Sequence, residues 1–174
     1  LDLIVAGDWM PITVFLNKEG KQLVDATKEM GLSETHGMWN TMEIVDINND
    51  GKKDILAGNV GENFKWKAST KTPIKMYLDD YDKNDQIDPI IFYTFFGKSI
   101  PFASKDKLTQ QLPYLKKRFQ DYRSFSKIKT ISDLTGKDED QILATIKINE
   151  LRSVLLLNTP KGFRKIPLPQ KAQQ

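Results

Sequence analysis

Two short acidic loops, each between apolar runs, constrain the fold of this chain more than any other feature. The loops cover residues 46–54 and 80–88, with the sequences DINNDGKKD and DYDKNDQID. In both, oxygen-bearing side chains stand at positions 1, 3, 5 and 9, and position 7 can offer its backbone carbonyl. Calcium takes about six to eight oxygen ligands, so alternate residues must point inward as the chain wraps around the ion. The spacing therefore predicts two calcium sites.

Each loop supplies five predicted ligands. Those of the first loop are Asp46, Asn48, Asp50, the carbonyl of Lys52, and Asp54. Those of the second are Asp80, Asp82, Asn84, the carbonyl of Gln86, and Asp88. Position 6 of the first loop is Gly51, which allows the positive φ angle that such wrapping needs. The second loop departs from this pattern with Asp85, although Asp tolerates the left-handed region better than most residues.

These loops do not fit the EF-hand pattern. An EF-hand has a Glu at position 12 and a helix on each side, whereas position 12 is Ala57 in the first loop and Ile91 in the second. Three of the predicted ligands in each loop are carboxylates, and they would repel one another without a cation. A bound metal is thus expected to stabilise the fold. The alternative is that Asp and Asn are present only because they form good turns.

The rest of the chain reads as short strands with one helical stretch. Strands are expected at residues 3–6, 9–16, 39–47, 55–57, 74–78, 90–96, 145–148, 153–158 and 163–168. Between Leu108 and Tyr122 apolar residues recur every three or four positions, which predicts an amphipathic helix. Ser104 is its expected N-cap, and Pro113 should divide it and lie in the first turn of the second part. Residues 138–143 form a further short helix, and residues 170–174 a frayed tail.

Charge is distributed unevenly along the chain. Residues 97–137 carry ten basic and three acidic side chains, although the whole chain has a net charge of only +3. A solvated helix surface explains such a run, and an anionic partner is the alternative. Cysteine is absent, which excludes disulfides, zinc fingers, iron–sulfur clusters and thiol catalysis. No apolar run is long enough for a transmembrane helix.

Residues 43–59 carry a resemblance to a known repeat. They read as a strand, then D-x-N-x-D-G-x-x-D, then an apolar strand that ends in glycine. This resembles the FG-GAP (VCBS-type) repeat of integrin-alpha-like β-propellers. Residues 7–12, 58–63, and 156–158 followed by 161–163 look similar to a bacterial branch of these proteins. Asp2 looks like the closing position of a further loop, which leads us to expect that these 174 residues are part of a larger propeller.

The resemblance implies a mainly β fold, a partial β-propeller of FG-GAP/VCBS blades with a helical insertion. Blades with calcium loops would occupy residues 1–96, a basic helical insert residues 97–143, and the closing strands of the last blade residues 144–174. Propellers have about four to eight blades, of which this length covers about three.

The resemblance also suggests a function. We expect a non-enzymatic calcium-binding module for protein or glycan binding, or adhesion, in an exported bacterial protein: extracellular, periplasmic or at the cell surface. No nucleic-acid partner is expected. One alternative is a catalytic or accessory domain of an exported polysaccharide-processing enzyme, and another is an anion-binding protein that uses the basic insert. His36, the only histidine, has no recognisable nucleophile beside it. Trp9, Trp39 and Trp66 are expected in the core rather than in a sugar-stacking platform.

Overall fold

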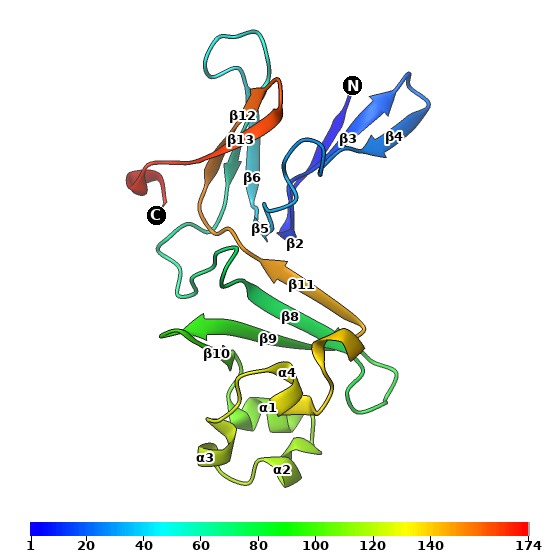
Figure 1. Cartoon of the computed structure of the whole chain (residues 1–174), viewed down its shortest axis with the longest axis vertical. Coiled ribbons are helices and arrows are strands. Elements are labelled where there is room, and N and C mark those ends of the chain that lie inside the picture. The colour runs from blue at the N-terminus through cyan, green and yellow to red at the C-terminus, as the bar shows by residue number, and fades with distance from the viewer. Residues whose placement is uncertain (174) are drawn as a thin grey trace. The chain divides into compact units, whose positions relative to one another are not determined.

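The computed structural model describes residues 1–173 and shows a mainly β chain, as predicted. Within these residues the strands form four antiparallel sheets: two have four strands, one has three and one has two. The chain folds into two compact units. Unit 1 comprises Leu1–Lys71 and Ile148–Gln174, and unit 2 comprises Thr72–Lys147. Figure 1 shows the elements of both units.

Unit 1 contains three of the sheets. One sheet has the order β1-β3-β4, with β1 at Leu3–Val5, β3 at Thr13–Lys18 and β4 at Gln22–Asp25. A small sheet pairs β2 (Asp8–Met10) with β5 (Gly37–Met38). The third sheet has the order β13-β12-β7-β6, with β6 at Thr41–Val45, β7 at Asp54–Gly58, β12 at Val154–Thr159 and β13 at Gly162–Pro167.

The third sheet shows how unit 2 is placed in the sequence. β12 pairs with β7 in the register Val154↔Ala57 and Leu156↔Ile55. Unit 2 therefore lies between two paired strands of this sheet in the sequence. These four residues are buried and belong to a core that also contains residues from the first sheet and the loops beside it. The buried members are Ile12, Val14, Leu32, Trp39, Ile55, Ala57, Val154 and Leu156. Alternate residues of β7 and β12 thus pack inward, as expected for strands with one buried face.

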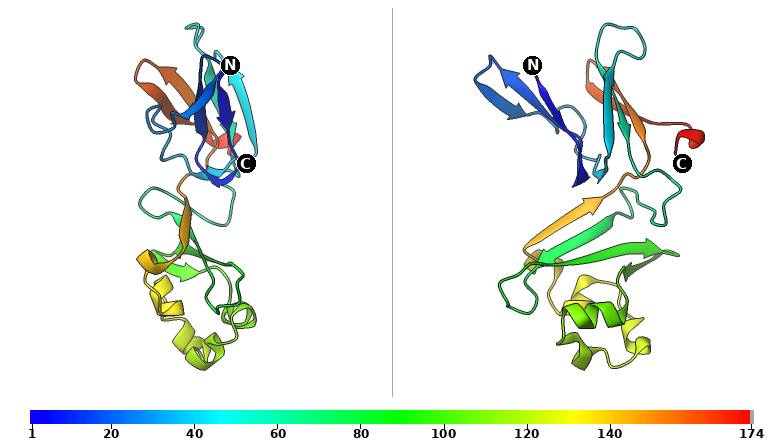
Figure 2. Two further views of the ribbon diagram at one scale, coloured as in Figure 1. Left: turned by 90° about the vertical axis from the view of Figure 1, so that its right-hand side faces the viewer. Right: turned by 180° about the vertical axis from the view of Figure 1, so that it is seen from behind.

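Unit 2 combines one sheet with a layer of short helices, seen from two further sides in Figure 2. The sheet has the order β10-β9-β8-β11, with β8 at Ile74–Asp79, β9 at Asp88–Phe95, β10 at Lys98–Pro101 and β11 at Ala144–Ile148. The helices are α1 (Lys105–Gln111), α2 (Leu115–Arg118), α3 (Tyr122–Phe125) and α4 (Ile131–Thr135). A 3-10 turn follows at Glu139–Gln141, and another lies in unit 1 at Gln170–Ala172.

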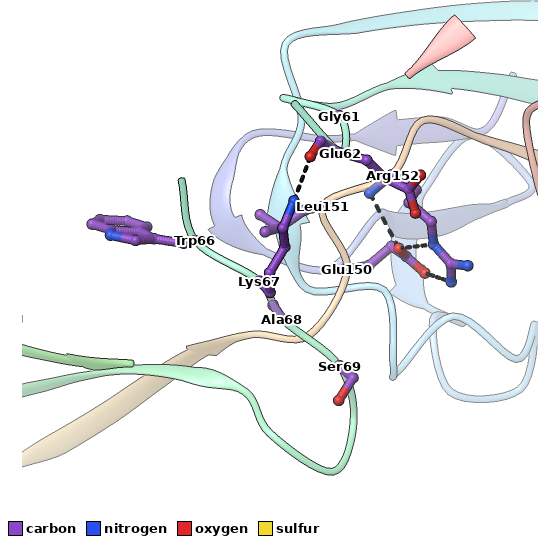
Figure 3. A pocket seen from close by; sticks show the side chains of 9 residues that line it. All are labelled: Gly61, Glu62, Trp66, Lys67, Ala68, Ser69, Glu150, Leu151 and Arg152. Carbon is purple, nitrogen blue, oxygen red and sulfur yellow. Dashed lines mark hydrogen bonds and ion pairs between the residues drawn. The ribbon is translucent and has the colours of Figure 1, made fainter. Parts of the chain in front are cut away.

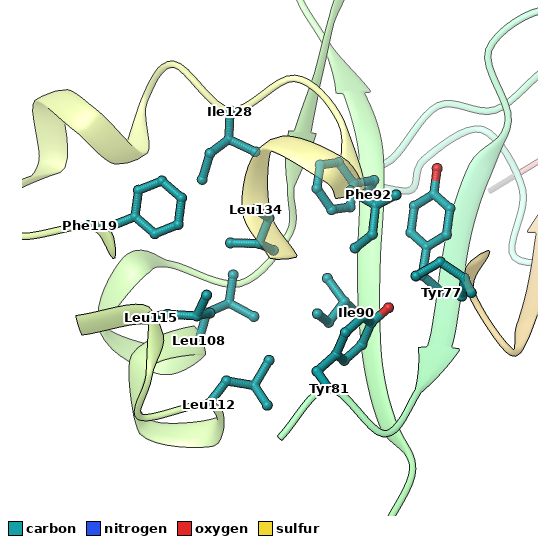
Figure 4. Close-up of a cluster of buried hydrophobic side chains, with 12 residues drawn as sticks. Tyr77, Tyr81, Ile90, Phe92, Leu108, Leu112, Leu115, Phe119, Ile128 and Leu134 are labelled. Atoms are coloured by element: carbon teal, nitrogen blue, oxygen red, sulfur yellow. The ribbon is translucent and has the colours of Figure 1, made fainter. Parts of the chain in front are cut away.

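The helices of unit 2 cover one face of its sheet and share a core with it (Figure 4). Tyr77, Ile90 and Phe92 point from β8 and β9 toward the helices. The helical layer contributes Leu108, Leu112, Leu115, Phe119, Ile128, Ile131 and Leu134. Helices of four to seven residues are not stable alone, so the burial of these apolar side chains is the main contribution that stabilises the helices on the sheet.

The predicted helix is present but divided more strongly than expected. Ser104 caps α1 by accepting a hydrogen bond from the backbone N–H of Lys107, as predicted. The break at Pro113 is also confirmed, although this residue lies in the turn before α2 rather than in the first turn of the helix. The prediction for Tyr122 is wrong. The apolar period places Tyr122 on the buried face of the helix, but Tyr122 is 56% exposed. The chain is not helical between α2 and α3, so the apolar period is interrupted before it reaches Tyr122.

Part of unit 2 precedes the basic helical insert that the sequence predicts at residues 97–143. The strands β8 and β9 form a compact unit with the helices, and this unit starts at Thr72. The reason is physical: the helices bury their apolar side chains against these strands. The tail is not frayed through residue 173, since Gln173 is 2% exposed. Its side chain accepts a hydrogen bond from the N–H of Ser153 and donates one to the carbonyl of Ser153.

Candidate metal centres

The two acidic loops share left-handed residues at the same two positions. Position 4 is left-handed in both, at Asn49 (φ 58°) and Lys83 (φ 62°). Position 6 is also left-handed in both, at Gly51 (φ 83°) and Asp85 (φ 63°). A non-glycine residue rarely adopts a positive φ, and Asp is among the residues that tolerate it best. Asp85 therefore takes the conformation expected of glycine at this position, and the departure in sequence does not change the course of the chain.

The hydrogen bonds inside the loops are equivalent as well. In the first loop, the carboxylate of Asp46 accepts from the N–H groups of Asp50 and Gly51 at 3.1 and 2.9 Å. In the second, the carboxylate of Asp80 accepts from the N–H groups of Asn84 and Asp85 at 3.0 and 2.9 Å. The position-1 carboxylate is thus fixed by the same two backbone donors in each loop.

Position 5 repeats this equivalence. Asp50 accepts from the N–H of Lys52 at 2.9 Å, and Asn84 accepts from the N–H of Gln86 at 2.8 Å. In both loops, the side chain at position 5 is therefore fixed by the backbone N–H of position 7. The side chains at positions 1 and 5 thus make the same hydrogen bonds in both loops.

The hydrogen bonds lower the pKa of one carboxyl in each loop. Bonds from the N–H of Lys52 and the side chain of Asn48 hold the pKa of Asp50 below its usual range. Burial acts to raise the pKa of Asp80. Bonds from the N–H groups of Asp85, Asn84 and Lys83, together with the charge of Lys137, outweigh burial, and the pKa of Asp80 is lowered. Asp50 and Asp80 are both ionised at neutral pH, the form in which a carboxylate ligates a cation.

The second loop brings three carboxylates together. One oxygen of each of Asp80, Asp82 and Asp88 lies within 4.8 Å of the others. Oδ2 of Asp88 is buried and finds no hydrogen-bond partner among residues 1–173. A buried carboxylate oxygen without a partner is costly, and a cation beside it would remove that cost. The donor set of the second loop therefore fits a hard divalent ion such as calcium.

The first loop arranges its predicted ligands differently. Asp54 is 0% exposed, and its two oxygens accept from the N–H of Ile47 at 3.1 Å and the N–H of Asn158 at 2.8 Å. The side chain of Asn48 donates to Asp50 at 3.0 Å. Within residues 1–173, the grouping of three carboxylates is found at the second loop and not at the first. In the first loop, Asp54 instead ties the loop to β12.

Two residues outside the predicted set contact the second loop. The side chain of Gln111 on α1 donates to Oδ1 of Asp88 at 3.0 Å. Nζ of Lys137 lies 2.7 Å from the carboxylate of Asp79, the last residue of β8, and 5.7 Å from the ring centre of Tyr81. Both residues belong to the helical region that follows the loop in sequence. No local spacing marks them, because 23 and 58 residues separate each from the carboxylate that it contacts.

Unit 1 has a separate small cavity of about 250 Å³ (Figure 3). It is lined by residues 61–62, 66–69 and 150–152. The carboxylate of Glu150 is buried and accepts from Nε and Nη2 of Arg152 and from Nζ of Lys165. Trp66 also lines the cavity, whereas Trp39 is buried in the core and donates its indole N–H to the carbonyl of Thr35. Trp39 is therefore unavailable for sugar stacking.

Comparison with known proteins identifies the start of the chain. A family model described as FG-GAP-like repeat matches residues 1–57. The match supports an FG-GAP-type repeat in this part of the chain. The matched region runs from β1 into β7 and contains the whole first acidic loop. The resemblance to an FG-GAP-type repeat is thus confirmed within residues 1–57. The second loop has the same positive φ angles at positions 4 and 6 and lies outside the matched residues.

The wider comparisons add no relative. Neither a curated protein nor a solved structure matches the chain. Among residues 1–173, the structure contains no helix with the length and apolar character needed to cross a bilayer.

Proposed function

We propose that this chain is a non-enzymatic, calcium-binding module of an FG-GAP-type, β-propeller-like protein. The convergence of Asp80, Asp82 and Asp88 within 4.8 Å carries the calcium proposal, together with the buried, unpartnered Oδ2 of Asp88. The FG-GAP-like repeat of residues 1–57 supports the propeller-like architecture.

In the second loop, the three carboxylates would hold the ion, with further oxygens from Asn84 and the Gln86 carbonyl. In the first loop, Asp46, Asn48, Asp50, Asp54 and the Lys52 carbonyl would do so. A bound cation would neutralise the carboxylates and link the two ends of each loop. Calcium would then act as a structural clamp between neighbouring strands, and removing it would destabilise the fold.

The proposed role of this clamp is to present loops to a protein or glycan partner, in adhesion or recognition outside the cytoplasm. Binding residues are commonly carried by loops on a rigid scaffold. An extracellular or cell-surface location agrees with the chemistry of the second loop. Asp82 is exposed, and exposed calcium sites of extracellular modules bind with dissociation constants of about 10⁻⁴–10⁻³ M. Such sites are filled where calcium is at millimolar concentration.

Isothermal titration of the calcium-free protein with calcium chloride tests the proposal. The Asp82→Asn variant removes one carboxylate of the cluster without removing any hydrogen bond that holds the loop. Asp140→Asn is the matched control, since Asp140 is an exposed carboxylate of the same unit outside both loops. We expect Asp82→Asn to lose the binding event of the second loop and Asp140→Asn to keep it. Absence of calcium binding to the unaltered protein at millimolar calcium would refute the proposal.

A further inference from the structure

The helix α1 contacts the second loop at the residue that closes it. Gln111, the last residue of α1, donates to Oδ1 of Asp88, the ninth residue of the loop and the first of β9. The other oxygen, Oδ2, is buried and without a partner among the described residues. One oxygen of Asp88 is therefore held by a helix, and the other is left for a ligand.

The position of Gln111 depends on how α1 packs. Leu108 and Leu112, which lie on either side of Gln111 in the sequence, are buried in the core of unit 2. Tyr81, the second residue of the loop, is buried in the same core (Figure 4). The loop and the helix are thus anchored in one set of packed side chains, and the amide of Gln111 is presented to Asp88 by that packing.

The other end of the loop contacts the helical region too. Lys137 follows α4, and its ammonium group pairs with Asp79 directly before the loop at 2.7 Å. The ring of Tyr81 lies beneath the same ammonium group. Both strand ends that enter the loop, β8 at Asp79 and β9 at Asp88, are therefore in contact with residues of the helical region.

We propose that Gln111 is a positioning residue for calcium in the second loop, and that calcium binding and the order of the helical layer are coupled through it. The inference rests on the proposed function. Groups that hydrogen-bond a metal-ligating carboxylate orient it, and their loss typically weakens metal binding about 10–100-fold. By linkage, a helical layer that favours calcium binding is itself stabilised by calcium to the same extent.

The experiment compares Gln111→Ala with Gln110→Ala. Gln110 is the neighbouring residue of the same type on the same helix, it is exposed, and it makes no contact with Asp88. Calcium chloride is titrated into each protein, and Asp82→Asn assigns the heat that belongs to the second loop. Gln111→Ala should weaken binding at the second loop about 10-fold and leave the first loop unchanged. Gln110→Ala should bind as the unaltered protein does.

Hydrogen exchange of residues 105–118 and the melting temperature give readouts that a purely structural role would not produce. Calcium should slow exchange in this segment of the unaltered protein, and Gln111→Ala should lose most of that protection at the same calcium concentration. If Gln111→Ala lowers the melting temperature equally with and without calcium, or binds at the second loop with unchanged affinity, Gln111 has no positioning role. That result leaves the proposed calcium function intact. Absence of second-loop binding in the unaltered protein overturns both.

Discussion

Glu150 offers the sharpest test of how unit 1 is held together. Its side chain is 4% exposed and lies between two cations, with Nε and Nη2 of Arg152 at 2.8 and 3.0 Å and Nζ of Lys165 at 2.9 Å. Glu150→Gln keeps the size of the side chain but removes its charge, and it turns an NH₂ group toward donors. The variant should therefore be less stable at neutral pH.

The expected magnitude follows from the exposure of the partners. A hydrogen bond to a charged group contributes about 1.5–3 kcal/mol. The side chains of Arg152 and Lys165 are 40% and 30% exposed, so water screens and partly replaces their interactions once the charge is gone. We therefore expect Glu150→Gln to lower the free energy of unfolding by about 2 kcal/mol.

The pH dependence of stability provides a second test of the Glu150→Gln prediction. Burial acts to raise the pKa of Glu150, but hydrogen bonds and charge from Arg152 and Lys165 outweigh it, and the pKa is lowered. A lowered pKa in the folded state contributes stability above the pKa of the unfolded chain, and this is lost as pH falls through the folded value. The difference between Glu150→Gln and the unaltered protein should therefore shrink below about pH 4.

Urea unfolding followed by tryptophan fluorescence measures this effect, because Trp9, Trp39 and Trp66 all lie in unit 1 with Glu150. Glu29→Gln is the control, an exposed glutamate of the same unit. A loss for Glu150→Gln no larger than that of the control would refute the reasoning, as would a difference that stays constant from pH 7 to below pH 4.

Two further substitutions test local features of unit 2. Phe96 is 90% exposed and has a φ angle of 45°, a region that Asn adopts more easily than Phe. Phe96→Asn should therefore raise the free energy of unfolding, measured by denaturant titration, by about 1 kcal/mol. A loss of stability would contradict this. Leu134 is fully buried in the helix–sheet core, so Leu134→Ala should cost about 2–5 kcal/mol, measured by exchange of the slowest amides of unit 2, and unchanged exchange would show that α4 does not hold the core.

The positive φ angles at Gly51 and Asp85 agree with the turn expected from the sequence, because such a turn depends on local chemistry. Position 1 is held by backbone donors four and five residues away, and position 5 by a donor two residues away. Spacing within nine residues is enough to encode these bonds. The matching conformation of the second loop, with Asp85 at a φ of 63°, shows that the pattern tolerates Asp where glycine is usual.

The contacts around the loops could not be predicted from spacing. Asn158 reaches Asp54 across 104 residues, and Gln111 reaches Asp88 across 23. The pairing of β12 with β7 likewise joins strands that lie on either side of unit 2 in the sequence, which no local pattern reports. The same limit explains Tyr122, because an apolar period predicts a buried face only while the helix continues.

A crystal structure of the protein grown with calcium, with the ion located by its anomalous scattering, tests the central claim most directly. The account predicts an ion in the second loop, about 2.3–2.6 Å from carboxylate oxygens of Asp80, Asp82 and Asp88, with the amide of Gln111 still bound to Asp88. A second loop that keeps its shape and holds no ion at saturating calcium would contradict it.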